Sequence, residues 1–214
     1  MPVMGKDFNY AERWSRLLLP LREREIAILE IGSAKGRSAV AFLGLLPLAR
    51  ITCIDIFTNA DHERQFDSAM APFGARVEKI KSRSVPALDA LAVQNRAFEV
   101  IYVDGSHARN DALMDSLLAW PLLKPDGIVI WDDYVWEMGR LPAEERPKDA
   151  IDLFLGLHAD QLTVLERGYQ VIVQRTSKRA GLPEFTEGFR FARTPRNFLR
   201  FLAGRSLERP HHGR

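Results

Sequence analysis

Three aspartates follow two apolar segments of the chain and could together hold a cation. Asp104 follows the apolar run of residues 98–103, and the pair Asp132 and Asp133 follows the run of residues 128–131. If both runs are parallel strands of one sheet, their carboxyl ends meet at the edge where open α/β sheets bind ligands. Clustered carboxylates repel one another and therefore usually hold a cation or raise a pKa. We predict these three aspartates as ligands of a hard divalent ion such as Mg²⁺; the alternative is that the aspartate pair caps a loop.

A glycine-containing segment nearer the N-terminus could bind a nucleotide-like cofactor. The apolar run of residues 27–31 leads into Gly32, Gly36 follows, and a helical pattern begins near Ser38. A strand, a glycine loop and a helix in this order present backbone N–H groups and the positive end of a helix to an anionic group. Asp55 ends the next apolar run, where a carboxylate can accept hydrogen bonds from both hydroxyls of a ribose. The alternative is a glycine loop that only turns the corner between strand and helix.

The spacing of the glycines argues against one class of cofactor. Dinucleotide-binding enzymes usually carry G-x-G-x-x-G, whose middle glycine lets a pyrophosphate approach the backbone. The segment from Gly32 to Gly36 has no middle glycine. An NAD-type oxidoreductase is therefore a less favoured interpretation.

Apolar runs alternate with amphipathic segments along most of the chain, which predicts an α/β fold. The predicted strands are residues 27–31, 51–55, 77–82, 98–103, 128–131, 162–165 and 169–174, and the predicted helices are residues 8–24, 38–46, 62–71, 85–93, 111–123 and 147–158. Pro125-Asp126-Gly127 predicts a turn before the fifth strand. The last two strands are joined tightly through Arg167-Gly168, which makes them antiparallel. We expect a Rossmann-like, doubly wound sheet of about seven strands, mostly parallel, with an antiparallel terminal hairpin strand.

Charge and composition divide the chain into three predicted segments. Residues 1–25 are a helical lead-in, residues 26–175 form the cofactor-binding domain, and residues 176–214 are a basic extension. From Arg175 onward the chain has ten Lys or Arg against three Glu, and its arginines alternate with phenylalanines. Basic residues among aromatic ones can bind RNA or an anionic surface. The favoured alternative is an amphipathic helix at residues 195–203 that packs against the domain.

The bulk composition is that of a globular protein in a reducing compartment. The chain has 214 residues, 46% of them hydrophobic and 27% charged, which is enough for one large α/β domain. Its single cysteine, Cys53, lies in a predicted strand and excludes an internal disulfide. The longest apolar stretch, residues 39–49, is too short to span a membrane, and the start of the chain lacks the apolar core of a signal peptide. We predict a cytoplasmic location.

Four motifs together resemble one enzyme family. The segment Glu30-x-Gly32-x-x-x-Gly36-x-Ser38 resembles motif I of the class I S-adenosylmethionine (SAM) methyltransferases. The later motifs are Tyr102-Val-Asp104-Gly-Ser-His107, Leu122-Leu-Lys-Pro-Asp-Gly127 and Trp131-Asp-Asp-Tyr134. They are similar to the bacterial methyltransferases grouped as family 24, and through these to the catechol-type and antibiotic-sugar O-methyltransferases. The resemblance covers about residues 10 to 175.

This resemblance implies SAM as the cofactor and a set of residues around it. Those residues are Glu30, Gly32, Ser33, Gly36, Ser38, Asp55, Ile56, Phe57, Ser82, Arg83, Ser84 and Asp104. In the family the glycines pass close to the methionine portion of SAM, and the position of Ser38 contacts its carboxylate. Ile56 and Phe57 are expected to line the adenine pocket, although Phe57 could equally be loop packing. The segment from Ser82 to Ser84 is expected beside the adenine ring, with Ser82 where the family usually has glycine.

The same resemblance implies the catalytic and metal-binding roles. In the catechol-type enzymes the positions of Asp104, Asp132 and Asp133 bind Mg²⁺, and the position of His107 holds a lysine base. We predict Asp104 and His107 as catalytic residues, with His107 as the base, because an imidazole pKa of about 6.5 suits proton abstraction near neutrality. The alternative is that His107 is a capping or hydrogen-bonding residue of its loop.

The expected function is therefore SAM-dependent methylation, most simply of a small-molecule hydroxyl, with Mg²⁺ as a further candidate cofactor. The segment of residues 135–149 follows the fifth strand and is expected to cover the acceptor site, with Trp136 either stacking on the acceptor or packing onto the domain. The alternative function is a non-catalytic nucleotide-fold protein that contacts nucleic acid or an anionic surface through its basic tail. Apolar residues near the N-terminus and in the tail are compatible with a homodimer.

Overall fold

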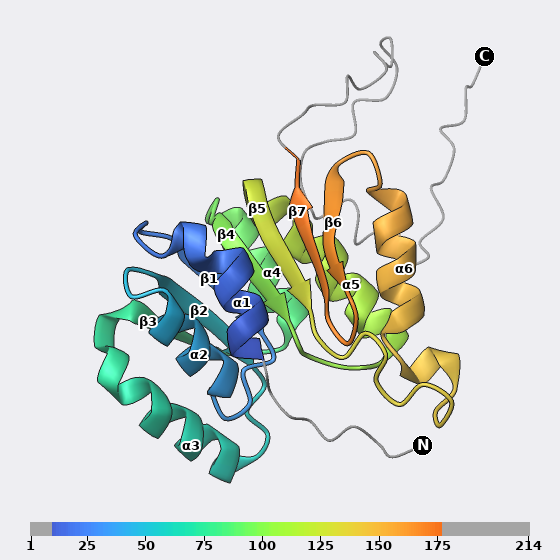
Figure 1. Ribbon diagram of the computed structural model, residues 1–214. Helices are drawn as coiled ribbons and strands as arrows, with labels where there is room; N and C mark the ends of the chain where they lie inside the picture. The colour runs from blue at the N-terminus through green and yellow to red at the C-terminus, as the bar shows by residue number, and fades with distance from the viewer. Residues whose placement is uncertain (1–9, 177–214) are drawn as a thin grey trace, which may run out of the picture. The chain divides into compact units, whose positions relative to one another are not determined.

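The computed structural model describes residues 10–176, which belong to one compact unit (Figure 1). Its strands are β1 (Ala27–Ile31), β2 (Arg50–Asp55), β3 (Val77–Lys81), β4 (Phe98–Val103), β5 (Leu123–Trp131), β6 (Leu162–Arg167) and β7 (Val171–Arg175). Its helices are α1 (Tyr10–Leu18), α2 (Arg37–Leu45), α3 (Ala60–Met70), α4 (Ser84–Val93), α5 (Arg109–Ala119) and α6 (Lys148–Leu157). Each strand and helix predicted within these residues has a counterpart in the structure, although several ends differ.

The seven strands form one sheet in the order β3-β2-β1-β4-β5-β7-β6. The pairs β1–β2, β2–β3, β1–β4 and β4–β5 are parallel, whereas β7 is antiparallel to both β5 and β6. A turn closed by the Gly168 N–H and the Gln170 carbonyl oxygen, 2.8 Å apart, lets β7 follow β6 directly. This arrangement confirms the predicted doubly wound sheet with an antiparallel terminal hairpin.

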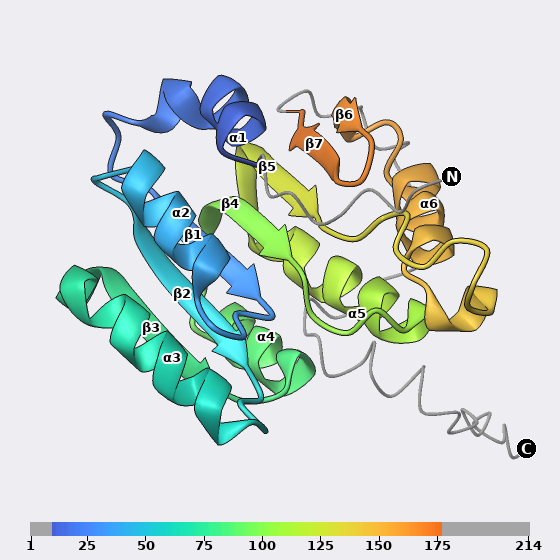
Figure 2. The same cartoon turned by 60° about the horizontal axis from the view of Figure 1, so that its bottom comes forward.

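Helices cover both faces of the sheet, so the core has two layers (Figures 1 and 2). Helices α1, α2 and α3 lie on one face, and α4, α5 and α6 lie on the other. Successive strand residues alternate between the two layers, as the pleat of a strand requires. In β4, Val100 and Tyr102 enter the layer of Trp14 and Phe42, whereas Ile101 and Val103 enter the layer of Phe154. Burial on both faces explains why the parallel strands read as continuous apolar runs.

Prolines end two helices earlier than the sequence patterns suggested. Pro20 and Pro121 each lie in the first turn of a short 3₁₀ helix that follows α1 and α5. Proline lacks a backbone N–H and clashes with the preceding helical turn, so an α-helix does not continue through it. The predicted helices at residues 8–24 and 111–123 therefore end as α-helices at Leu18 and Ala119.

One prediction about β5 needs correction. Pro125-Asp126-Gly127 was predicted as a turn before the strand, but these residues lie within β5, which begins at Leu123. Phe98 pairs with Leu123 and Val100 with Ile128, so one residue of β4 lies opposite four of β5. The chain does bend there, with Asp126 at φ 61°, but as an irregularity inside a paired strand.

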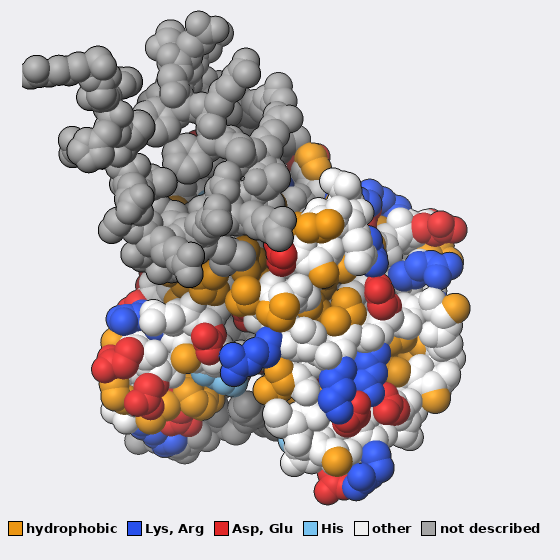
Figure 3. All heavy atoms as spheres, turned by 180° about the vertical axis from the view of Figure 1, so that it is seen from behind, with side chains coloured by type: hydrophobic (Ala, Val, Ile, Leu, Met, Phe, Trp, Pro, Cys, Tyr) orange, Lys and Arg blue, Asp and Glu red, His pale blue; other side chains and the backbone are white. Residues whose placement is uncertain are grey.

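Within residues 10–176, no helix is long and apolar enough to cross a membrane. The surface seen from behind mixes acidic and basic side chains among apolar ones (Figure 3). The predicted basic extension, including the helix proposed at residues 195–203, lies outside the described part of the chain.

Candidate functional site

The glycine loop and the Asp104 loop meet at the point where the strand order reverses, between β1 and β4. The Gly32 N–H donates to the Ile54 carbonyl, and the Asp104 N–H donates to the Ile31 carbonyl, both at 2.8 Å. Gly32 has φ +90°, and a Cβ on it would lie 2.0 Å from the Asp104 carbonyl oxygen. Ligands of open α/β sheets bind at such a switch point. The predicted cofactor loop is therefore in direct backbone contact with the predicted acidic pocket.

Glu30, at the end of β1, is a fully buried carboxylate below the glycine loop. The Ser38 hydroxyl donates to its Oε1 atom at 2.6 Å, while Oε2 has no hydrogen-bond partner among the described residues. Burial raises the pKa of Glu30 above its usual range. The Ser38 side chain is thus used within the protein. Helix α2 has no side-chain hydrogen bond at its Gly36 N-cap, so its first backbone N–H groups can still receive an anionic group.

Asp55 organises the loops that surround the predicted ribose position. Its Oδ2 atom accepts the Ala34 N–H at 2.8 Å and its Oδ1 atom accepts the Phe57 N–H at 2.7 Å. Each carboxylate oxygen retains a further lone pair, so Asp55 can also accept hydroxyl hydrogen bonds. Ile56 is half exposed at this edge, but Phe57 is buried against Phe66. The geometry of Phe57 is therefore that of loop packing.

The segment from Ser82 to Ser84 joins β3 to α4 beside Asp55. The Ser82 N–H donates to the Asp55 carbonyl at 2.9 Å, and Ser84 begins α4. Behind Ser84 lies the buried carboxylate of Asp115, which the sequence analysis did not single out. Burial raises the pKa of Asp115 to about 6, and the Ser84 hydroxyl partly offsets this. The predicted adenine-binding segment thus borders a buried acid.

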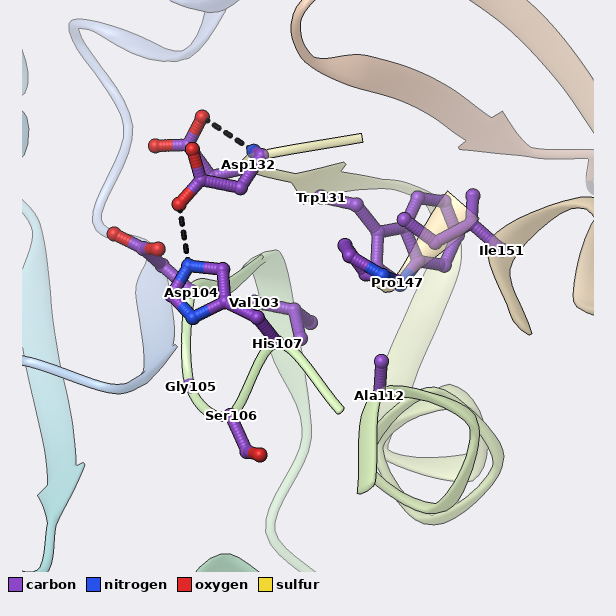
Figure 4. Close-up of a pocket in the computed structure, with 11 residues that line it drawn as sticks. Val103, Asp104, Gly105, Ser106, His107, Ala112, Trp131, Asp132, Pro147 and Ile151 are labelled. Atoms are coloured by element: carbon purple, nitrogen blue, oxygen red, sulfur yellow. Dashed lines mark hydrogen bonds and ion pairs between the residues drawn. The ribbon is translucent and has the colours of Figure 1, made fainter. Parts of the chain in front are cut away.

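The second half of the site is a small pocket between the loops after β4 and β5 (Figure 4). Asp104, His107 and Asp133 each offer a ligand atom there, and these atoms lie within 4.8 Å of one another. The His107 ring points toward the carboxylates, and its Nε2 atom is 2.6 Å from Oδ2 of Asp133. The other oxygen of Asp133 accepts a hydrogen bond from the Tyr169 hydroxyl. This group can hold a divalent cation or a shared proton.

Asp132 lies in the same pocket but makes different contacts. Its Oδ2 atom accepts the Tyr102 hydroxyl at 2.5 Å, and its Oδ1 atom accepts the Asp133 N–H at 2.8 Å. The Tyr102 oxygen is also 3.3 Å from Oδ2 of Asp104. Asp132 does not belong to the group of converging ligand atoms found among the described residues. Its predicted role as a metal ligand stays a prediction.

The clustering of acids changes the pKa of Asp104. Burial, followed by the negative charges of Asp132 and Asp133, raises the pKa of Asp104 to about 8. Positive charge in the pocket would relieve this repulsion. The electrostatics of the pocket therefore favour a cation.

Three aromatic residues contact the histidine and the aspartates of the pocket, and only one of them was given a role from the sequence. Trp136 stacks on His107 with ring centroids 4.4 Å apart and an interplanar angle of 28°. Tyr102 and Tyr169 hold the aspartates but were not predicted. Tyr102 is two residues before Asp104 in a strand, which places both side chains on one side and was a usable signal. Tyr169 lies in the β6–β7 turn, and no sequence feature links it to Asp133.

The fold and the site together define a Rossmann-like enzyme of the class I methyltransferase type. Residues 29–134, about half of the chain, match the family model described as a methyltransferase domain. The chain thus belongs to the SAM-dependent methyltransferases of this family. No curated protein sequence matches it significantly.

Several solved structures share the fold at low sequence identity. A putative caffeoyl-CoA O-methyltransferase from Staphylococcus aureus superposes with a TM-score of 0.62 at 18% identity, covering 82% of this chain and 85% of that one. An O-methyltransferase from Bacillus cereus in complex with SAH (S-adenosylhomocysteine) gives 0.63 at 18% identity, with coverages of 82% and 84%. The methyltransferase MycE of mycinamycin biosynthesis, in complex with Mg, SAH and mycinamycin VI, superposes with a TM-score of 0.60 at 17% identity. The match covers 81% of this chain but only 51% of MycE, about half its length.

Proposed function

We propose that the protein transfers the methyl group of SAM to a hydroxyl oxygen of a small molecule. The observation that carries this proposal is the backbone contact between Gly32 and Asp104. It places the cofactor loop directly beside a pocket that holds carboxylates and an imidazole. The neighbours crystallised with SAH support the choice of cofactor, and those that are O-methyltransferases support oxygen as the acceptor atom.

The residues of the first half of the site fit SAM group by group. Asp55, held by two backbone N–H groups, is positioned to accept the ribose hydroxyls. The N-terminus of α2, without a side-chain cap, suits the methionine carboxylate. The Oε2 atom of Glu30, which has no hydrogen-bond partner in the described part of the chain, suits the amino group. Ile56 and the segment from Ser82 to Ser84 are proposed to border the adenine ring. Ser33 and Gly36 complete the loop around the methionine portion.

The residues of the second half fit a divalent cation and a hydroxylated acceptor. Asp104 and Asp133 are the proposed oxygen ligands, with Asp132 as a further candidate. When bound, SAM supplies an electrophilic methyl group, and a divalent cation supplies positive charge that lowers the pKa of an acceptor hydroxyl. The chain's own contribution is to hold the acceptor oxygen in line with the methyl group, and such alignment can contribute about 7–11 kcal/mol.

His107 was predicted as the base that removes the hydroxyl proton. Its ring lies in the pocket, as that role requires, and Asp133 orients it as the acid of a catalytic dyad orients its histidine. The position of its Nε2 atom, pointing at the proposed ligand atoms, favours another role as a ligand of the cation. Trp136 covers one face of the ring and is proposed to border the acceptor.

Calorimetric titration with SAM and SAH, with and without Mg²⁺, tests the cofactor directly. We expect micromolar binding that is lost in Asp55→Ala and retained in Asp67→Ala, which removes an exposed acid of α3. Because Asp55 also holds two backbone N–H groups, circular dichroism must show that the variant is folded. Methyl transfer from labelled SAM to a panel of phenols and sugars then tests the acceptor atom. Folded wild-type protein that binds neither SAM nor SAH would overturn the proposal.

The alternative of a nucleic-acid-binding protein has no support from the comparisons. Its only motivation is the basic extension, which lies outside the described residues. We therefore propose the enzyme alone.

A further inference from the structure

We infer that Nε2 of His107 is a direct ligand of the cation, so that the metal site combines one imidazole with the carboxylates of Asp104 and Asp133. This inference rests on the proposed function, because it concerns the cation of the same pocket. It assigns His107 a role other than that of the proton-accepting base. It also changes the expected metal, since a site of oxygen ligands alone suits Mg²⁺ best.

The first argument is the distance between the ligand atoms. Atoms of Asp104, His107 and Asp133 lie within 4.8 Å of one another. Ligands that bind one ion with bonds of about 2.0–2.2 Å lie between about 3 and 4.4 Å apart. The three atoms thus need only a small inward shift to share one ion. Nε2 and Oδ2 of Asp133, now 2.6 Å apart, need to separate slightly for the same purpose.

The second argument is that other side chains already hold two of the ligands in place. The Tyr169 hydroxyl donates to Oδ1 of Asp133, which leaves Oδ2 facing His107. Trp136 stacks on the His107 ring and fixes its plane. Groups that orient ligands in this way are a usual part of metal sites. The side chains are therefore arranged for a cation before it arrives.

The third argument concerns which nitrogen faces the pocket. Nε2 points at the carboxylates, as Figure 4 shows. A ring nitrogen that binds a cation has no lone pair left to take a proton. The roles of ligand and base are thus exclusive for this atom, and metal preference distinguishes them. Imidazole favours Co²⁺ and Zn²⁺ over Mg²⁺, whereas carboxylates and amide oxygens favour Mg²⁺ and Mn²⁺.

Two substitutions separate the role of ligand from that of base. In His107→Gln the side-chain amide oxygen can reach the position of Nε2, so an oxygen ligand replaces the nitrogen ligand at a similar distance from the backbone. In His107→Ala no donor remains. His62→Gln serves as the matched control because it removes an imidazole from α3, outside the group of converging ligand atoms.

Calorimetry with Mg²⁺ and with Co²⁺, on full-length protein saturated with SAH, gives the first readout. We expect Co²⁺ affinity to fall about tenfold or more in His107→Gln while Mg²⁺ affinity changes less than about threefold. Both affinities should fall in His107→Ala, and neither should change in His62→Gln. Pulsed electron paramagnetic resonance of bound Mn²⁺ gives a second readout, because a coordinated imidazole nitrogen couples to the metal. That coupling should be present in wild type and absent in His107→Gln.

The outcomes separate this inference from the proposed function. If Co²⁺ affinity is unchanged in His107→Gln and wild type shows no nitrogen coupling, His107 is not a ligand. If SAH binds but no cation does, the inference fails while the methyltransferase proposal stands. If neither SAH nor a cation binds to folded protein, the proposed function itself fails.

Discussion

Gly32 and Asp104 approach each other so closely that no side chain fits between them. A Cβ on Gly32 would lie 2.0 Å from the Asp104 carbonyl oxygen and 2.5 Å from its carbonyl carbon. Both of these are backbone atoms, which cannot rotate away as the end of a side chain can. The first glycine of the loop is therefore needed for β1 and β4 to end side by side, in addition to any role in admitting a cofactor.

Gly32→Ala should destabilise the protein strongly even without a cofactor. The substitution adds a backbone clash to a residue at φ +90°, and together these should lower the free energy of unfolding by about 2–5 kcal/mol. Gly44→Ala is the control, because a Cβ there, inside α2, meets no atom within 4 Å. The free energy of unfolding of this control should rise by about 0.5–1 kcal/mol, because alanine is a better helix former than glycine. Urea unfolding of the two variants checks this, and equal stabilities would show that the loops can separate at little cost.

Glu30→Gln should make the protein more stable but a weaker binder of SAM. Glu30 is fully buried, its Oε2 atom has no hydrogen-bond partner within residues 10–176, and burial raises its pKa. A raised carboxyl pKa means that this group's stabilisation falls as pH rises through the folded-state value. At a pH above that folded-state value, the neutral amide should therefore increase the free energy of unfolding, by about 1–3 kcal/mol, while removing the charge proposed to bind the cofactor's amino group.

Glu99→Gln is the matched control for that experiment. Glu99 accepts the Ala27 N–H at 2.8 Å and pairs with Lys124 at 2.6 Å, away from the loop. This control should be slightly less stable than wild type and should bind SAH normally by calorimetry. A Glu30→Gln protein with unchanged SAH affinity would remove Glu30 from the cofactor site.

Asp115 should make stability depend on pH between about 4 and 6. Its pKa is about 6 in the folded protein against an ordinary value of 3.8, so the folded state binds the proton more tightly than the unfolded state. The stabilisation is complete below pH 4 and is lost as pH rises through 6. The free energy of unfolding of Asp115→Asn, relative to that of wild type, should thus rise by on the order of 3 kcal/mol between pH 4 and pH 7.

Urea unfolding at four pH values in that interval measures this difference. The control is Asp160→Asn, which removes an exposed acid that follows α6 and should follow the wild-type curve. If the difference between Asp115→Asn and wild type is constant with pH, Asp115 does not titrate in this range.

Periodicity and loop spacing were sufficient to predict the fold and the edge of the sheet at which the candidate residues lie. Strands buried on both faces give continuous apolar runs, and the tight turn before β7 requires an antiparallel strand. Parallel strands present their carboxyl ends at one edge of the sheet, and this rule alone places Asp55, Asp104 and Asp132 at that edge.

Side-chain pairing within the site could not be predicted in the same way. The contact of Ser38 with a ligand stays a prediction, whereas the hydrogen bond that its hydroxyl donates to Glu30, where both side chains are buried, was not foreseen. Tyr169 reaches Asp133 across 36 residues of sequence, through the register of β5 and β7. Such contacts depend on register and rotamer, which spacing along the chain does not determine. The irregularity in β5 was missed for a similar reason, because turn residues inside a paired strand look like a loop.

Tyr169→Phe should weaken cation binding without a matching loss of stability. The Tyr169 hydroxyl donates to one oxygen of Asp133 and so directs the other toward His107. Loss of a group that orients a metal ligand typically lowers affinity by about 10–100-fold. Tyr134→Phe is the control, since its hydroxyl donates to Asp152 at 2.8 Å, outside the converging group. Both variants lose one side-chain hydrogen bond and should lose about 1 kcal/mol of stability, but only Tyr169→Phe should bind Mn²⁺ more weakly in calorimetry. Equal Mn²⁺ affinities in the two variants would mean that Asp133 holds its position without Tyr169, or that the cation binds elsewhere.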